Sequence, residues 1–191
     1  MNSELIRNDF PILKTKVGGH QIVYFDNAAT TQRPLPVVNA VLDYTTHENG
    51  NPHRGAHIFA ISASEAYDTS KEVVRDFIHA RSEKEIIYTR NTSESLNLVA
   101  RSYGETHLKA GDHILITIAE HHSNLVTWQR VAQKTGATLD YIYVDKETGH
   151  FPEEELKKIG DPRVKLFAFA EVSNVLGIDF DPKPLIQRAH A

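Results

Sequence analysis

The second half of the chain alternates regularly between short apolar runs and segments with helical spacing, and this pattern limits the fold more than any other feature. Neighbouring parallel strands need a crossover connection, which is usually a helix. The alternation therefore predicts an α/β fold with a mainly parallel sheet flanked by helices. The predicted strands are 85–90, 113–118, 138–144 and 164–172, and the predicted helices begin near residues 92, 125, 152 and 182.

The first half of the chain is less regular. A polar N-terminal arm covers residues 1–20, and the segment QIVYF, residues 21–25, predicts a short strand. Pro36 is well placed to open a helix over 36–42, because proline is favoured at the first helical position. A longer helix is predicted over 62–79. We expect residues 21–191 to belong to one domain that follows the arm.

Composition excludes several classes of protein. The 191 residues are 40% hydrophobic and 24% charged, which is typical of a soluble globular protein, and the net charge of −4 gives no basic face for nucleic acid. No run approaches the roughly 18 apolar residues of a membrane span, and the start lacks the pattern of a signal peptide. We expect a cytoplasmic protein without nucleic-acid or membrane partners. The absence of cysteine removes disulfides, thiolate ligands and a nucleophilic thiol.

A candidate phosphate site lies where the predicted strand 85–90 gives way to a helix. Asn91 is a good N-cap residue, and Glu94 follows three residues later as in a capping box. The N–H groups and hydroxyls of Thr92 and Ser93, together with the helix dipole, suit a phosphate group. The same residues also describe an ordinary well-capped helix, and no glycine-rich nucleotide motif is present.

Two adjacent histidines, His121 and His122, follow the predicted strand 113–118 at the edge of the sheet where ligands of α/β folds collect. An imidazole can bind metal, move protons or stack on a flat ligand, and one ring can face a ligand while the other caps the helix or meets solvent. Asn174 follows another strand, where its amide can contact a ligand or tie its own turn. Together these strand ends suit a planar phosphorylated cofactor.

A metal site is a weaker interpretation of the remaining histidines. His53 and His57 are four residues apart, but Pro52 and Gly55 indicate a loop rather than the helix that such a ligand pair needs. We therefore expect no metal site. His53 can instead face an anionic ligand, or it can organise the loop.

Six segments in order carry a family resemblance: FPIL, YFDNAATTQRP, NPHRGAH, YTRNTSESLNLVARSYG, EHHSNLVTWQ and VSNVLG. The chain resembles the N-terminal portion of the SufS-type (group II) cysteine desulfurases, which belong to the class V aminotransferase family of pyridoxal 5′-phosphate (PLP) enzymes. The resemblance covers essentially all 191 residues. It implies that residues 21–191 form part of a fold type I large domain. It also implies a full-length homodimer that converts L-cysteine to L-alanine and passes the sulfur, through an acceptor protein, to iron–sulfur cluster assembly.

The resemblance also implies roles for individual residues. Thr92 and Ser93 match the dipeptide that binds the PLP phosphate, although the family more often has two threonines there. His121 matches the histidine that stacks on the pyridine ring and takes part in proton movement. Asn174 matches the asparagine near the ring oxygen and the substrate. Ala28 and His53 match positions that line the substrate pocket.

The family's Schiff-base lysine, pyridine-pairing aspartate, persulfide cysteine and carboxylate-binding arginine have no match in this sequence. The chain also stops within a predicted helix, without a cap or a following strand. We therefore expect a chain truncated before the lysine and inactive by itself. The alternatives are another class V enzyme such as a selenocysteine lyase, a non-catalytic phosphate-binding or interaction module, and lastly a histidine-based metal hydrolase.

Overall fold

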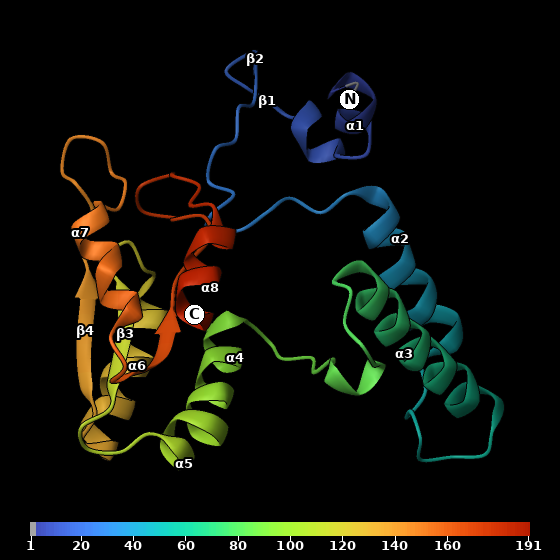
Figure 1. The fold of residues 1–191 in the computed structure, drawn as a ribbon. Coiled ribbons are helices and arrows are strands. Elements are labelled where there is room, and N and C mark those ends of the chain that lie inside the picture. The colour runs from blue at the N-terminus through green and yellow to red at the C-terminus, as the bar shows by residue number, and fades with distance from the viewer. Residues whose placement is uncertain (1–2) are drawn as a thin grey trace. The chain divides into compact units, whose positions relative to one another are not determined.

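The computed structural model describes residues 3–191, and the chain divides into two compact units, one up to Ile87 and the other from Tyr88 to Ala191. The first unit is mainly helical, with one antiparallel hairpin of two short strands (Figure 1). Its elements are helix α1 (Ser3–Asn8), 3-10 helix η1 (Pro11–Lys14), strands β1 (Lys16–Val17) and β2 (His20–Gln21), helix α2 (Leu35–Asp43), π-helix η2 (Tyr44–Glu48), helix α3 (Ile58–Phe77) and 3-10 helix η3 (Glu83–Glu85).

Helices α2 and α3 confirm the two helices predicted in this unit, although α3 begins at Ile58 rather than near residue 62. The predicted strand 21–25 is wrong, since Gln21 ends the strand and no ladder continues from it. The predicted strand 85–90 is also absent. A strand needs a neighbour for its N–H and C=O groups, and among the described residues no strand pairs with residues 22–25 or 85–90. Phe25 is accordingly 91% exposed.

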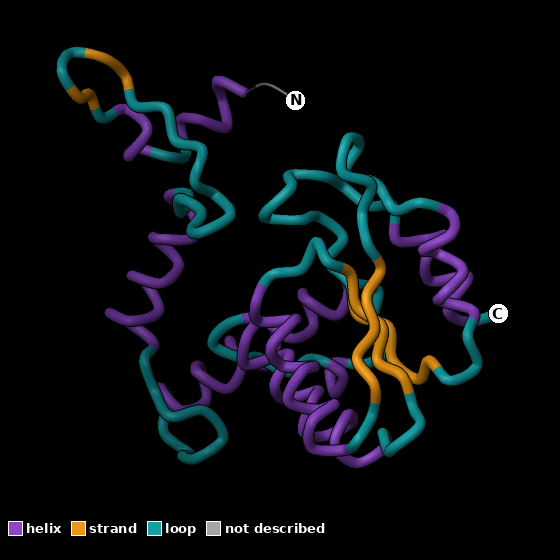
Figure 2. The backbone as a smooth tube through the Cα atoms, turned by 90° about the vertical axis from the view of Figure 1, so that its left-hand side faces the viewer, coloured by secondary structure: helices purple, strands orange, loops and turns teal. Residues whose placement is uncertain are grey.

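The second unit holds a three-stranded parallel sheet in the order β4-β3-β5, so β3 is the central strand. Figures 1 and 2 show helix α6 on one side of this sheet and helix α8 on the other. This arrangement confirms the predicted α/β class. The elements are α4 (Thr92–Val99), π-helix η4 (Ala100–Gly104), α5 (Glu105–His107), β3 (His113–Thr117), α6 (His122–Thr135), β4 (Thr138–Ile142), α7 (Glu153–Leu156), 3-10 helix η5 (Lys157–Gly160), β5 (Val164–Ala168) and α8 (Pro182–His190).

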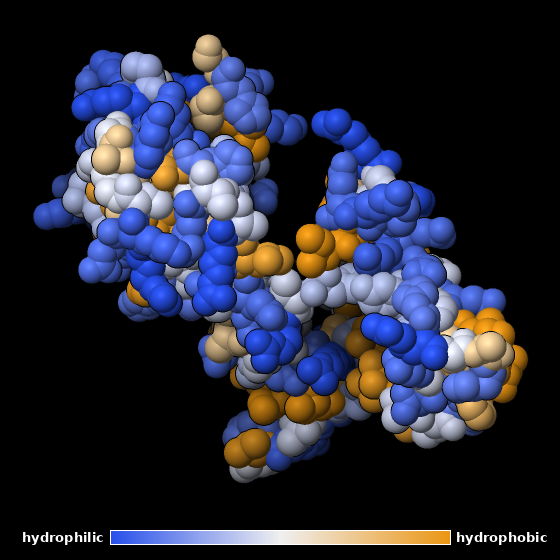
Figure 3. Space-filling view, turned by 90° about the horizontal axis from the view of Figure 1, so that it is seen from below, coloured by the Kyte–Doolittle hydropathy of each residue, from blue (hydrophilic) through white to orange (hydrophobic). Residues whose placement is uncertain are grey.

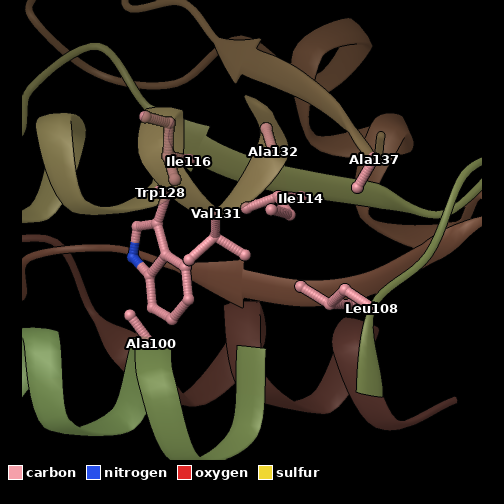
Figure 4. Close-up of a cluster of buried hydrophobic side chains, with 8 residues drawn as sticks. All are labelled: Ala100, Leu108, Ile114, Ile116, Trp128, Val131, Ala132 and Ala137. Carbon is pink, nitrogen blue, oxygen red and sulfur yellow. The ribbon is translucent and has the colours of Figure 1, made fainter. Parts of the chain in front are cut away.

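Strand β3 is apolar because both of its faces are covered. Side chains alternate along a strand, so Ile114 and Ile116 pack on the side of α6, while Leu115 packs in the cluster that includes Leu185 of α8. In Figure 4 the ring of Trp128 lies between β3 and η4. All three β3 side chains are fully buried, and each contributes about 1.5–3 kcal/mol by leaving water.

Large apolar side chains also remain exposed, many of them along α2 and α3. Figure 3 shows such residues, coloured orange, reaching the surface in several places. None of the helices within residues 3–191 combines the length and the apolar content needed to cross a bilayer.

Candidate functional site

Helix α4 begins with the predicted cap. Asn91 is extended, and its Oδ1 accepts a hydrogen bond from the Glu94 N–H at 3.0 Å. The Glu94 carboxylate does not return to the N-cap N–H, as the capping box predicts, but accepts from the Arg90 N–H at 2.7 Å and from its guanidinium at 3.2 Å. These bonds lower the pKa of Glu94. The helix start is thus well capped, with the acidic charge near it paired.

Thr92 and Ser93 present free donors at this helix start. Both residues are exposed, and within residues 3–191 neither their N–H groups nor their hydroxyls have a hydrogen-bond partner. The first N–H groups of any helix lack intrahelical partners and, with the helix dipole, favour an anion. Ser93 also lines a surface hollow of about 450 Å³, together with Arg90 and Arg101. The groups that a phosphate needs are therefore available here.

Helices α4 and α6 are held together by a polar contact and close packing. Asn97 Nδ2 donates to the Ser93 carbonyl at 2.8 Å and to Thr127 Oγ1 of α6 at 3.2 Å. At the end of η4, a β-carbon added to Gly104 would lie only 3.2 Å from Trp128. The Asn97 bond holds α4, and the close approach at Gly104 holds the end of η4, against the helix that carries the histidine pair.

His121 is the N-cap of α6. Its Nδ1 accepts from the Ser123 N–H at 3.1 Å and lies 2.8 Å from Ser123 Oγ. Since Nδ1 is an acceptor, the proton of the neutral ring is on Nε2. His122 is the first residue of α6, and the two rings meet edge to face at 6.2 Å. The histidines are not equivalent, because the ring predicted to stack on the ligand also caps the helix.

Glu120, which precedes His121, organises the end of β3. One carboxylate oxygen accepts from the Thr117 hydroxyl and from the Ala170 N–H, the latter at 3.0 Å. The other accepts from Asn124 Nδ2 at 2.7 Å. Sequence reasoning missed the roles of Glu120 and Asn124. The available signal was a carboxylate just before the helix start followed four residues later by an amide inside the helix.

The loop after β5 is anchored by Ser173 rather than by Asn174. Ser173 is 1% exposed, and its hydroxyl donates to the Ala119 carbonyl at 2.8 Å while accepting from the Val175 and Leu176 N–H groups. Asn174 is exposed, and its amide has no hydrogen-bond partner within the described part of the chain. The structure thus leaves this amide available to a ligand.

The four predicted cofactor residues all lie in the second unit. Thr92 and Ser93 open α4, which packs on α6, and His121 opens α6. Asn174 lies in the loop that is bonded to Ala119, two residues before His121. No hydrogen bond within residues 3–191 joins these four side chains directly; the scaffold between them sets their arrangement.

The two predicted substrate-lining residues lie in the first unit. Ala28 is exposed in a turn that Tyr24 supports, since the phenol donates to the carbonyls of Asp26 and Thr30. His53 has a left-handed backbone, with φ of 58°, which is strained for a residue with a β-carbon. Contacts with α3 hold it: its N–H donates to Ser64 Oγ at 2.8 Å, and its ring pairs with Asp68.

Metal ligands do not gather anywhere in residues 3–191, where no group of three or more His, Cys, Asp or Glu side chains is placed to hold an ion. His53 and His57, which are four residues apart, make other contacts instead. His57 caps α3 by accepting from the Ala60 N–H, and His53 braces the loop against the same helix.

Comparison with known proteins places this arrangement in a family. The aminotransferase class-V profile matches residues 23–191. The chain belongs to the aminotransferase class-V family. A probable cysteine desulfurase of Synechocystis sp. is 45% identical over 185 residues, which cover 97% of this chain and 44% of that protein.

Solved structures agree. The apo structure of a cysteine desulfurase from Thermococcus onnurineus NA1 has a TM-score of 0.86 and 40% identity, covering 98% of this chain and 44% of that one. The cysteine desulfurase CsdA of Escherichia coli has a TM-score of 0.79 and 32% identity, over 100% of this chain and 46% of that one. This class-V chain therefore has the expected partial desulfurase-like fold, and it spans less than half the length of these relatives.

Proposed function

We propose that residues 88–191 form the phosphate-binding and ring-binding part of a PLP site in a cysteine desulfurase. The observation that carries the proposal is at the start of α4, where the N–H and hydroxyl groups of Thr92 and Ser93 have no partner among residues 3–191. This helix start belongs to a helix that packs on the helix capped by His121. This donor set fits a phosphate ester with a flat ring attached to it.

Each residue has a distinct task in this proposal. PLP, when bound, supplies the electron sink for bond cleavage at the amino acid. Thr92 and Ser93 hold the phosphate through their N–H and hydroxyl groups. His121 lays its ring on the pyridine and holds a proton at Nε2, since Nδ1 is used by the helix cap. Asn174 donates its free amide to the ring oxygen or to the substrate.

For the whole protein, we propose a SufS-type, cytoplasmic homodimer that converts L-cysteine to L-alanine and delivers the sulfur to an acceptor protein for iron–sulfur cluster assembly. The names of the relatives support desulfuration of cysteine. Ala28 and His53 would line the substrate pocket. The covalent lysine and the sulfur-accepting thiolate must come from outside these residues, because the chain contains no cysteine and no match to the lysine motif.

Calorimetric titration of the 191-residue chain tests the site. The probe is pyridoxamine 5′-phosphate, which has the ring and the phosphate but no aldehyde to react with surface lysines. The double variant T92A/S93A should weaken binding at least about tenfold, because it removes both phosphate-facing hydroxyls. Ser102→Ala, which removes an exposed hydroxyl from η4, is the matched control and should bind like the wild type.

The ring contact needs a second variant. His121→Asn keeps a side-chain acceptor for the helix cap but removes the imidazole. It should weaken binding of pyridoxamine 5′-phosphate while leaving inorganic phosphate binding unchanged. Wild-type binding by both T92A/S93A and H121N would contradict the proposal.

Activity is tested in a full-length protein that carries this sequence. Desulfuration of L-cysteine should fall much more for His121→Ala than for His122→Ala, because only His121 is assigned to the ring. A strong preference for L-selenocysteine over L-cysteine would instead support the selenocysteine lyase alternative.

A further inference from the structure

Two loops that carry proposed cofactor residues are bonded to each other. The loop after β3 contains Ala119 and Glu120, just before His121, and the loop after β5 contains Ala170 and Ser173, just before Asn174. The Ala170 N–H donates to the Glu120 carboxylate at 3.0 Å, and the Ser173 hydroxyl donates to the Ala119 carbonyl at 2.8 Å. We call these four residues the clasp.

The clasp is anchored in the core of the unit. Glu120 accepts from Asn124 at 2.7 Å, and Asn124 in turn accepts from Trp128 Nε1 at 2.7 Å. Asn124 is 8% exposed and Trp128 is 2% exposed. A chain of hydrogen bonds therefore connects the loop to a side chain that packs between β3 and η4 (Figure 4).

The Glu120 carboxylate has little freedom to move. Its oxygens accept from the strand end at Thr117, the β5 loop at Ala170 and helix α6 at Asn124. Displacing it would leave these partly buried donors unsatisfied, which is costly. The backbone that leads into His121 is consequently fixed relative to the loop that leads into Asn174.

We propose that Glu120 is a positioning residue that, together with Ser173, fixes the His121 ring and the Asn174 amide for the flat ring of PLP. This inference rests on the proposed function. It adds that the placement of the His121 ring and the Asn174 amide depends on the Glu120 carboxylate, which does not touch the cofactor. Phosphate binding at the start of α4 does not depend on Glu120.

The test uses Glu120→Gln in the full chain. The substitution keeps the shape but replaces one acceptor oxygen with an NH₂ donor, so at least one of the three donors loses its partner. Calorimetry should show affinity for pyridoxamine 5′-phosphate falling about tenfold, a size typical of broken polar networks. Affinity for inorganic phosphate should stay at the wild-type value.

A combined variant separates positioning from general destabilisation. If Glu120 acts through the His121 ring and the Asn174 amide, adding E120Q to the double variant H121N/N174A should weaken binding of pyridoxamine 5′-phosphate no further. A merely structural role would make the loss from E120Q add to that of the double variant, and that result would overturn the inference. Hydrogen exchange of the Ala170 amide should be faster in E120Q than in the wild type, because its acceptor is weakened.

Ser173→Ala is the variant to test if E120Q does not fold, because it removes the bond from Ser173 to the Ala119 carbonyl without adding a donor. It should also weaken pyridoxamine 5′-phosphate binding and leave phosphate binding unchanged. Failure of the wild type to bind pyridoxamine 5′-phosphate would overturn the proposed function and this inference with it. Wild-type affinity in folded E120Q and S173A, with the wild type binding well, would overturn this inference alone.

Discussion

The indole nitrogen of Trp128 donates a hydrogen bond to Asn124 Oδ1, 2.7 Å away and one turn earlier in α6. Asn124 then donates to Glu120 at 2.7 Å. The amide therefore satisfies a buried indole on one side and a carboxylate of the candidate site on the other. Asn124 therefore connects the packing of the core to the geometry of the candidate site.

Replacing Asn124 with alanine should lower the free energy of unfolding by about 1–3 kcal/mol, because the buried Trp128 N–H loses its acceptor. Urea denaturation followed by circular dichroism measures the change. Gln129→Ala, at an exposed position of the same helix, should change it by less than about 0.5 kcal/mol. Equal stabilities of the two variants would show that the buried bond contributes nothing.

The cap of α6 gives a second prediction. His121→Ala should destabilise the chain by about 1 kcal/mol through loss of the Nδ1 acceptor, whereas His121→Asn should largely retain stability. His122→Ala, one residue inside the helix, should have little effect on stability. Thermal unfolding of the three variants checks this order, and a loss in H122A as large as that in H121A would refute the capping assignment.

The loop before α3 approaches that helix very closely at Gly50. A β-carbon at this position would lie 2.3 Å from the Phe59 carbonyl oxygen, which is backbone and cannot swing aside. Gly50→Ala should therefore cost more than about 1 kcal/mol and speed proteolysis within residues 49–57. At Gly160 a β-carbon meets nothing within 4 Å, so Gly160→Ala should be near neutral. Similar melting temperatures for the two variants would contradict the close contact.

Acid should weaken the start of α4. The Arg90 N–H and guanidinium lower the pKa of Glu94, so the stabilisation is fully present above the unfolded value near 4.3 and is lost as pH falls through the lower folded value. The stability difference between wild type and Glu94→Gln should shrink as the pH drops from 7 to below about 4. Melting temperatures across that range measure it, and a pH-independent difference would contradict the pairing. Glu171→Gln, an exposed substitution, should stay close to wild type at pH 7.

Local features of this fold were predictable from sequence. The run at 113–118 was predicted as a strand, and β3 is central and covered on both faces, which is why its middle residues, Ile114, Leu115 and Ile116, are all apolar. Asn91 was predicted as a cap because capping depends on residues within one turn. The predictions of strands over 21–25 and 85–90 were wrong because an apolar sequence pattern does not by itself supply a partner strand along the whole segment.

The clasp could not be predicted in the same way. Glu120 and Ala170 are fifty residues apart in sequence, so their bond depends on the register of β3 against β5. The left-handed backbone of His53 was likewise invisible, because contacts with Ser64 and Asp68 of α3 maintain it. The family resemblance is what assigned Thr92, Ser93, His121 and Asn174 to the cofactor, and these roles remain predictions.

The cap formed by His121 also bears on how a ligand would be received. Its ring cannot change rotamer without releasing the Ser123 N–H, so any swing of the imidazole leaves the first turn of α6 without this side-chain cap. The imidazole ring consequently loses its rotational freedom when the chain folds, before any ligand binds. A flat ligand would meet a receptor that is already ordered, and its affinity would not be reduced by the need to arrest a freely rotating side chain.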